Sequence, residues 1–462
     1  MWKAGAFPVS VPPSNELSIE QFGYKQELRR SLTFWDLVAY GLVFMVPIAP
    51  MGIFGQVIQT ANGMVVLAYL IGLVGMIFTA YSYFRMSEAF PVAGSAYAYV
   101  QRGWHPDVGF VAGWMILLDY ILIPALLYLV SAAWLAALVP WMPTWAWVVI
   151  FVVINTLINI GGIEMTNTAN WIILVIEGIT FLLFSIMALV YVGGGHGGTH
   201  FTLSPIFNSH GFSLSMVGAA TSIAVLSFLG FDGISTLSEE TRGGRQTVGK
   251  ATVWSLVIVC FLFVVLTYLA AVAYPNYMHF PDINNAFYYV AQRVGGSWLS
   301  MLCLVVTVVS WGFANALAAQ AAVSRMLFSM GRDRMLPQIL SWVHPRRKTP
   351  VVATLLVGVL SIVVTSFLSI ANLSRLVNFG ALTAFMLLNL TVILFHYFRK
   401  RSQRFLAHLV MPAVGFLVLL YVWANFDRLT FYMGIGWFVL GMIILGFTTK
   451  GFRHLPKELE GL

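Results

Sequence analysis

Three carboxylic acids lie within stretches of sequence that are otherwise almost wholly apolar. Asp119 lies in GWMILLDY at residues 113–120, Glu177 in IILVIEGIT at residues 172–180, and Asp232 in SFLGFDG at residues 227–233. A carboxylate surrounded by hydrocarbon is costly, and by default it marks a proton path, a cation site or a buried pair. We therefore expect Glu177 and Asp119 to carry a coupled proton. Glu177 as a partner of an amine, or either residue as a hydrogen-bonded core group, is the alternative.

Asp232 differs from the other two because Gly230 and Gly233 flank it. Glycine tolerates backbone angles that a helix forbids, so these residues predict an interruption of the helix. A carboxylate at the end of a half-helix can bind a cation. Capping of the second half-helix is the alternative role for Asp232.

The composition places these acids in a membrane. Of 462 residues, 59% are hydrophobic and 9% charged, whereas about a quarter of the residues of a soluble domain are charged. An α-helix needs roughly 20 apolar residues to cross a bilayer, and about twelve such runs predict an all-α integral membrane protein. Their approximate cores are residues 33–58, 64–84, 108–138, 143–162, 168–192, 214–236, 251–273, 298–328, 351–370, 375–398, 405–425 and 430–449.

The chain has a net charge of +8, and its lysines and arginines are predicted to lie mainly on one side of the membrane. With the N-terminus inside, all of the 25 lysines and arginines except Arg293, Arg375 and Arg428 fall on the cytoplasmic side. This bias predicts that both termini are cytoplasmic, and it makes a nucleic-acid partner unnecessary.

The first apolar stretch, residues 32–58, contains two prolines and two glycines near its centre, at Pro47, Pro50, Gly52 and Gly55. We expect the helix to unwind there. Unwound backbone at membrane depth must line a cavity or be buried in protein, and in transporters such breaks form the substrate site. The break at Asp232 is its expected partner.

The two breaks supply most of the candidate substrate-binding residues, and Tyr97 and Trp311 are added from neighbouring segments. The full set is Ala49, Pro50, Met51, Gly52, Ile53, Phe54, Tyr97, Phe228, Gly230, Phe231, Asp232, Gly233 and Trp311.

Other functional classes have weaker support. His196, His200 and His210 lie in a Gly-rich loop without a cysteine, so we expect no metal and no other cofactor. The sequence contains no HExxH, GxSxG or Walker A motif, which argues against catalytic residues and against an ATP-driven pump. A channel is less compatible with two interrupted helices, and a non-transporting sensor is disfavoured by the short predicted tails.

Several motifs together resemble the amino acid-polyamine-organocation transporter family over nearly the whole chain. They are Gly52-Ile53-Phe54 after the first break, PVAGSAY at residues 91–97, FLGFD at 228–232 leading to EET at 239–241, SRMLFSMGRD at 324–333, and the His344-Pro345 and Thr349-Pro350 pairs. The resemblance implies a LeuT-like fold of two inverted five-helix repeats plus two helices, with helices 1 and 6 discontinuous.

This fold implies a division of the chain into seven parts. They are a cytoplasmic tail (1–31), the first repeat (32–192), an extracellular loop (193–213), the core of the second repeat (214–370), helix 10 (371–398), helices 11 and 12 (399–449) and a cytoplasmic tail (450–462).

Within the family, the chain is most similar to bacterial putrescine importers, with likeness at residues 41–42, 113–120, 237–241 and 378–382. Amino-acid carriers of the family usually have Gly-Ser-Gly in helix 1, where backbone amides hold the substrate carboxylate. This chain has Pro50, Met51 and Gly52 at those places, and Pro50 lacks an amide donor. The departure favours an amine without a carboxylate.

We therefore predict a proton-coupled, secondary-active importer of a small organic amine or amino acid, with putrescine-type polyamines favoured. It is expected in the bacterial inner membrane as a monomer or homodimer. An α-amino acid permease or exchanger is the alternative, and a ligand sensor is less favoured.

Overall fold

The computed structural model describes residue 20, residues 25–244 and residues 246–449; the predicted tails lie mostly (1–31) or wholly (450–462) outside these ranges. The regular secondary structure of the described residues is helical, and the strand-like contact among them is an isolated parallel bridge between Leu32 and Thr241. Ten described segments are long and apolar enough to cross a membrane, α1 and α2 form a further bent pair, and α13 is a shorter apolar helix. The prediction of an all-α, multi-pass membrane protein is confirmed.

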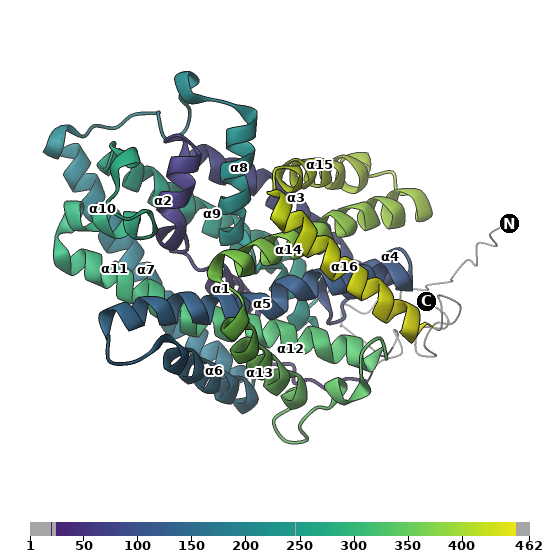
Figure 1. Ribbon diagram of the computed structural model, residues 1–462. Helices are drawn as coiled ribbons and strands as arrows, with labels where there is room; N and C mark the ends of the chain where they lie inside the picture. The colour runs from purple at the N-terminus through teal and green to yellow at the C-terminus, as the bar shows by residue number, and fades with distance from the viewer. Residues whose placement is uncertain (1–19, 21–24, 245, 450–462) are drawn as a thin grey trace.

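The elements follow the chain as Figure 1 shows. The α-helices are α1 (Phe34–Met45), α2 (Pro50–Thr60), α3 (Val65–Ala89), α4 (Ser95–Gly103), α5 (Pro106–Leu138), α6 (Thr144–Gly161), α7 (Ile163–Gly193), α8 (Leu214–Ala224), α9 (Thr247–Ala273), α10 (Ala286–Gly295), α11 (Ser297–Val309), α12 (Ala316–Arg332), α13 (Val351–Phe367), α14 (Ile370–Val392), α15 (Met411–Ala424) and α16 (Arg428–Thr448). Short 3-10 turns are η2 (His196–Gly198), η3 (Ser209–Gly211), η4 (Val225–Phe228), η5 (Phe231–Glu240), η6 (Tyr277–His279), η7 (Ile283–Asn285) and η9 (Gln338–Ser341), and π-helical turns are η8 (Ser310–Asn315), η10 (Ile393–Arg399) and η11 (Leu406–Val410).

The first predicted span is broken between α1 and α2, whose axes differ by 53°. The chain leaves the helix at Val46, where φ is +53°, and the next helix begins at Pro50. A proline at the first helical position loses no hydrogen bond, because that N–H has no partner in a helix anyway. The unwound part is therefore residues 46–49, which is shorter than the proline and glycine pattern predicts, and Gly52 and Gly55 lie inside α2.

The second predicted break lies between η4 and η5. Leu229 is extended, and Gly230 has a φ of +116°, which residues other than glycine rarely adopt. A Cβ atom at Gly230 would also lie 2.6 Å from the Phe44 ring. Both the angle and the close approach require glycine here, so the predicted interruption of helix 6 is confirmed.

The helix α5 runs through the middle of the molecule and contacts α4, α6, α12, α13, α14 and η8. In its most apolar window 89% of the residues are buried, against 22% in α16. Two tryptophans join α16 to α5. The rings of Trp114 and Trp437 stack with their centroids 4.5 Å apart, and each indole N–H donates to the backbone carbonyl of the other residue at 2.9 Å. The helix α5 thus forms the core, and α16 presents most of its apolar surface outward.

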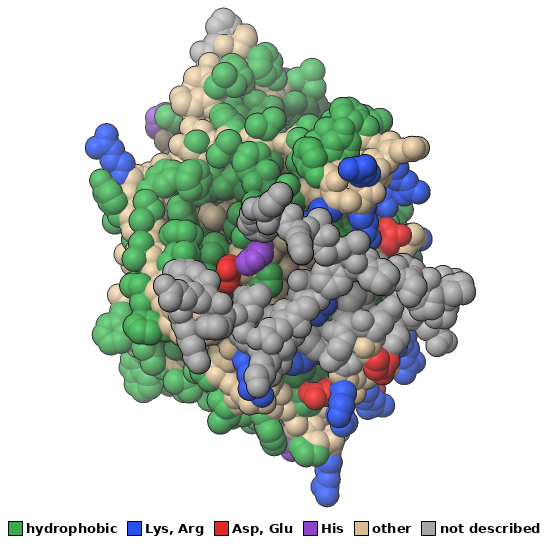
Figure 2. Space-filling view, turned by 90° about the vertical axis from the view of Figure 1, so that its right-hand side faces the viewer, with side chains coloured by type: hydrophobic (Ala, Val, Ile, Leu, Met, Phe, Trp, Pro, Cys, Tyr) green, Lys and Arg blue, Asp and Glu red, His purple; other side chains and the backbone are tan. Residues whose placement is uncertain are grey.

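Lysine and arginine side chains are visible around one face of the molecule, here named the basic end (Figure 2). It includes Arg332 at the end of α12 and Arg399 at the end of η10. Such clustering is what the positive-inside rule leads us to expect. The side of the membrane that this end faces remains a prediction.

Candidate functional site

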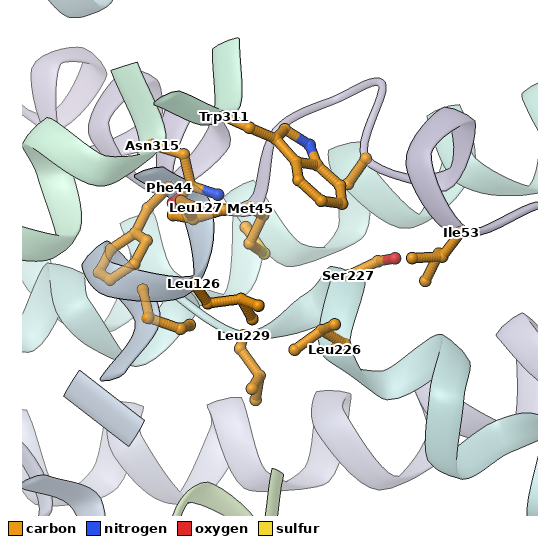
Figure 3. Close-up of a pocket in the computed structure, with 12 residues that line it drawn as sticks. Phe44, Met45, Ile53, Leu126, Leu127, Leu226, Ser227, Leu229, Trp311 and Asn315 are labelled. Carbon is orange, nitrogen blue, oxygen red and sulfur yellow. The ribbon is translucent and has the colours of Figure 1, made fainter. Parts of the chain in front are cut away.

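A cavity of about 40 Å³ lies between the two helix breaks (Figure 3). The first break contributes Ala49, the second Ser227 and Leu229, and the remaining walls come from neighbouring helices. The lining residues are Phe44, Met45, Ala49, Ile53, Ile123, Leu126, Leu127, Leu226, Ser227, Leu229, Trp311 and Asn315. The cavity is therefore mostly apolar, and no charged side chain is among the residues that line it.

Trp311 and Asn315 come from η8, a π-helical turn between α11 and α12. Such turns inside α-helices are frequent at functional sites because they turn side chains out of the regular pattern. Asn155 of α6 supports the turn by donating to the Gly312 carbonyl at 3.1 Å. Trp311 lies against Gly52, where a Cβ atom would be 2.7 Å from the indole. Gly52 thus makes room for the tryptophan that covers one side of the cavity.

The few polar groups at the cavity are neutral. The Asn315 Oδ1 acceptor and the Trp311 Nε1 donor have no hydrogen-bond partner among the described residues, while the Ser227 hydroxyl lies 3.3 Å from that of Tyr69. Buried polar groups are normally hydrogen-bonded, and unsatisfied ones call for a ligand or water. The site therefore offers one acceptor and one donor within apolar walls.

The backbone amides of the first break are largely used within the chain. The amide of Ala49 donates to Val46 O at 2.8 Å, that of Met51 to Ile48 O at 2.9 Å, and that of Gly52 to Ala49 O at 3.1 Å. Pro50 has no amide. A substrate carboxylate would have to compete with these bonds, so the break is poorly suited to holding one.

The sequence-predicted residues of helix 1 divide into two groups. Ala49 and Ile53 line the cavity. Pro50, Met51, Gly52 and Phe54 do not line it; Phe54, for example, packs edge-on against Phe280 and Phe287.

In helix 6, none of the five predicted residues lines the cavity itself. Gly230 and Gly233 each lie against Phe44, with a hypothetical Cβ 2.6 and 2.4 Å from its ring. Phe228 packs against Tyr69 and Phe263, and Phe231 packs against Tyr83 and Phe385. The glycines thus shape the cavity indirectly, by admitting Phe44.

Tyr97 lies away from the cavity. Its hydroxyl donates to Asp333 Oδ2 at 2.8 Å and accepts from the Gln101 amide at 2.7 Å. Sequence reasoning did not select Phe44, Met45 or the α5 residues of the lining, because apolar residues in an apolar span give no signal for a site.

The three acids are all buried, and none takes part in an ion pair among the described residues. Glu177 of α7 faces Ser310 of η8, and neither of its oxygens has a hydrogen-bond partner of good geometry in the described chain. Asp232 accepts a hydrogen bond from the Tyr120 hydroxyl. Asp119 of α5 is 1% exposed, and its Oδ1 atom has no hydrogen-bond partner among the described residues. The arrangement places Glu177 beside η8 and Asp232 against the Tyr120 hydroxyl of α5.

At the basic end, two ion pairs join η5 to α12; we name them the ion-pair layer. Glu240 accepts from Arg325 at 2.7 and 2.9 Å, and Glu239 accepts from Arg332 at 2.9 and 3.2 Å. Arg325 and Arg332 lie two turns apart on one face of α12. Glu239 also accepts from the Ala93 amide at 3.0 Å. These contacts close the space between η5, α12 and the start of α4.

A segment before α1 reinforces the ion-pair layer. The amides of Ser31 and Leu32 donate to Glu240 O at 2.9 and 3.1 Å, and the Arg242 amide donates to Leu32 O at 2.7 Å. The end of η5 is therefore held from two sides.

At the opposite end, neutral groups join α2 to η6 and η7; we name them the amide layer. Gln56 donates to Asn284 Oδ1 at 3.1 Å, Gln59 to Tyr277 O at 3.1 Å, and the Tyr277 hydroxyl to Asn62 Oδ1 at 3.0 Å. Gly55 allows close approach, because a Cβ there would lie 2.1 Å from Ile283 O. The ion-pair layer and the amide layer thus differ in chemistry.

Comparison with known proteins identifies the family. The family model described as "Amino acid permease" matches residues 32–449. The low-affinity putrescine importer PlaP of Escherichia coli K12 is 32% identical over 440 residues, covering 94% of this chain and 97% of that protein. The branched-chain amino acid permease BcaP and the methylthioribose transporter, both of Bacillus subtilis, are each 25% identical, covering 91% and 94% of this chain and 93% and 96% of their own lengths. The chain therefore belongs to the amino acid permease family and is a membrane transporter rather than an enzyme.

Proposed function

We propose that the chain imports a small organic amine by proton-coupled alternating access, with the cavity between the helix breaks as the substrate site. The observation that carries this proposal is the position of the cavity, whose lining comes from both interrupted helices. In alternating access, one layer opens while the other stays closed. In such a cycle, the ion-pair layer and the amide layer would be the two contacts that open in turn.

An amine without a carboxylate is the favoured substrate, with putrescine-type polyamines first. The amides that would hold a carboxylate are engaged within the first break, and a relative at 32% identity is a putrescine importer. Glu177, beside η8, is a candidate partner for an ammonium group at the edge of the site.

An α-amino acid is the second candidate substrate. The apolar walls of the cavity would suit an aliphatic side chain, and one relative at 25% identity is a branched-chain amino acid permease. The mode would then be symport or exchange of an amino acid, with the same two layers.

The proposed topology follows from charge. The basic end would face the cytoplasm of a bacterial inner membrane, with both termini inside, and the amide layer would face outward. Twelve helices in two inverted five-helix repeats plus two would complete a LeuT-like fold, and the unit would act as a monomer or homodimer.

Uptake into proteoliposomes tests the function. We expect labelled putrescine to accumulate under an inward proton gradient, and a protonophore to abolish the accumulation. A panel of labelled amino acids is run in parallel with empty liposomes as the control. Accumulation of an amino acid alone would overturn the substrate proposal, and equal uptake with and without the gradient would overturn proton coupling.

A further inference from the structure

The connection between α14 and α15 concentrates positive charge on a short stretch of chain. Arg399, Lys400, Arg401 and Arg404 lie within six residues, and all four are exposed. The sequence contains no aspartate or glutamate between residues 333 and 427. The cations of this connection are therefore not balanced by acids nearby in the sequence.

The two candidate membrane spans beside this connection place it at the membrane surface. One span ends at Arg399 and the next begins at Leu406. A stretch as short as residues 400–405, which leaves one span and returns to the next, reaches at most about 10 Å beyond their ends. Phe398, Phe405 and Leu406 are exposed at these ends. Exposed aromatic residues at the ends of spans are typical of the level where phospholipid headgroups meet acyl chains.

The connection has a fixed form. The Ser402 amide donates to His396 O at 3.0 Å, and the Ser402 hydroxyl accepts from the Arg404 amide at 3.3 Å and lies 2.7 Å from His408 Nδ1. The imidazole rings of His396 and His408 stack with their centroids 4.4 Å apart. A turn that is already ordered loses little conformational entropy when it binds a ligand.

Protein groups hold two of the four cations. The Arg399 guanidinium donates to the carbonyl of Gly103 at 3.2 Å and to that of Trp104 at 2.7 Å, where α4 ends. The Lys400 ammonium lies 4.5 Å from the centre of the Phe395 ring, as in a cation–π contact. These two side chains fix the connection against α4 and η10.

The other two cations, Arg401 and Arg404, have no ion pair or side-chain hydrogen bond in the described part of the chain. Glu88 of α3, which interacts with His408 of this region, is already bound to Arg85 at 3.1 Å. Two guanidinium groups therefore remain available to an anion from outside the described protein.

The groups around these arginines favour an anionic phospholipid over a soluble anion. Arginine binds phosphate oxygens through paired N–H groups, and a cluster of four or more lysines and arginines directly after a membrane span is typical of anionic lipid binding. A free phosphate would gain nothing from the exposed Phe398, Phe405 and Leu406, whereas the acyl chains of a lipid would cover them.

A second basic stretch, at Arg346, Arg347 and Lys348, has a different setting. It lies in the longer connection between α12 and α13, which passes through η9 first, so its cations are not confined to the ends of two spans. One of them, Arg347, also donates to Ile160 O at 3.5 Å. This stretch therefore provides a control that is matched in charge.

We propose that the connection between α14 and α15 binds the headgroup of an anionic phospholipid, with Arg401 and Arg404 on its phosphate. The exposed Phe398, Phe405 and Leu406 contact its acyl chains. A lipid bound in this way joins the ends of α14 and α15 at the membrane surface. The inference depends on neither the substrate nor the coupling ion.

Co-elution of labelled lipid with the full-length protein tests the proposal. The protein is purified in a mild detergent, titrated with labelled dioleoyl phosphatidylglycerol or dioleoyl phosphatidylcholine, and passed through a size-exclusion column. We expect the protein to retain phosphatidylglycerol and little phosphatidylcholine. The double variant Arg401→Gln with Arg404→Gln should bind phosphatidylglycerol about 25-fold more weakly, or about fivefold for each cation removed.

The matched control is Arg346→Gln with Arg347→Gln, which removes the same charge and should bind phosphatidylglycerol like the wild type. Equal loss in the two double variants, unchanged binding by the Arg401 and Arg404 variant, or equal retention of phosphatidylcholine would overturn the proposal. Displacement of the lipid by micromolar sn-glycerol 3-phosphate would assign the arginines to a soluble anion instead. A dimer that only the Arg401 and Arg404 substitutions dissociate would assign them to a second copy of the chain, which also overturns it.

A salt titration of the wild-type protein provides a second test if the glutamine variant does not fold. Salt screens exposed charges, and the Debye length falls from about 10 Å at 0.1 M to about 3 Å at 1 M ionic strength. Retention of phosphatidylglycerol should therefore fall several-fold over this range. Unchanged retention would show that apolar contact alone holds the lipid, and it would contradict the role of the two arginines.

Discussion

The ion-pair layer and the amide layer hold their elements together by different chemistry. The ion-pair layer joins η5 to α12 through four charged side chains, of which Glu239 and Glu240 are fully buried. The amide layer joins α2 to η6 and η7 through neutral groups, of which Gln56 and Asn284 are exposed. Removing one partner of a buried ion pair costs about 3–5 kcal/mol, whereas a neutral hydrogen bond contributes about 0.5–1.5 kcal/mol.

This difference indicates how each layer keeps its closed form. The ion-pair layer depends on complementary charge, so a single substitution leaves an unpaired charge in a buried place. The amide layer depends on close packing around Gly55, with hydrogen bonds as a smaller addition. The two layers should therefore be sensitive to different kinds of substitution.

The largest effect is expected for Arg325→Met, which leaves Glu240 buried without its partner. Uptake of putrescine into proteoliposomes should fall by at least about tenfold, because an unpaired buried carboxylate costs several kcal/mol, and the melting temperature in detergent should fall as well. The double variant Glu240→Gln with Arg325→Met removes both charges. It should recover part of the lost uptake and part of the lost melting temperature. A double variant no better than Arg325→Met would show that charge pairing is not what the layer needs.

Gly55→Ala should have the next largest effect, at the other layer. The added Cβ would lie 2.1 Å from the backbone oxygen of Ile283, so α2 cannot approach η7 as it does now. We expect a several-fold loss of uptake and increased labelling of a cysteine placed at Ala49, which lines the cavity, by a water-soluble reagent added outside. The control is Gly178→Ala, whose added methyl group meets nothing within 4 Å. Equal behaviour of the two alanine variants would mean that close packing does not hold the amide layer.

The sequence predicted the breaks well because proline and glycine act on the local backbone. It did not predict that Pro50 starts α2, since proline both interrupts a helix and begins one, and the two cases have the same composition nearby. The presence of ion pairs could be anticipated from the sequence, because a charged residue such as Arg325 in an apolar segment must find a partner.

The cavity lining was much harder to predict. Leu126 and Leu127 of α5 line it, yet they resemble the leucines that face lipid, because the membrane is as apolar as the protein interior. Tyr97 was expected at the site, but the orientation of the short helix α4 points it to Asp333 instead. Such orientations depend on packing between helices, which the order of residues does not encode locally. The assignment of substrate contacts therefore remains a prediction.

Glu239→Gln should have a moderate effect. The amide keeps an acceptor for the Ala93 N–H, and Arg332, at 13% side-chain exposure, reaches water more readily than Arg325 at 5%. Uptake should fall by about threefold to tenfold, less than in Arg325→Met, because the Arg332 guanidinium that loses this carboxylate is partly solvated. Initial rates at several substrate concentrations check this order. A greater loss in Glu239→Gln than in Arg325→Met would show that burial does not rank the two ion pairs.

The smallest effect is expected for Gln56→Ala, which removes the bond to Asn284 in the amide layer. Both side chains are accessible to water, so the released groups are hydrated and the loss should be at most about 1 kcal/mol, or less than about fivefold in uptake. Asn284→Ala removes the same bond from the other side and should match it, and the double variant should be no worse than either single one. If Gln56→Ala instead equals Gly55→Ala, then hydrogen bonds and not close packing hold the amide layer, and the contrast between the two layers is one of charge alone.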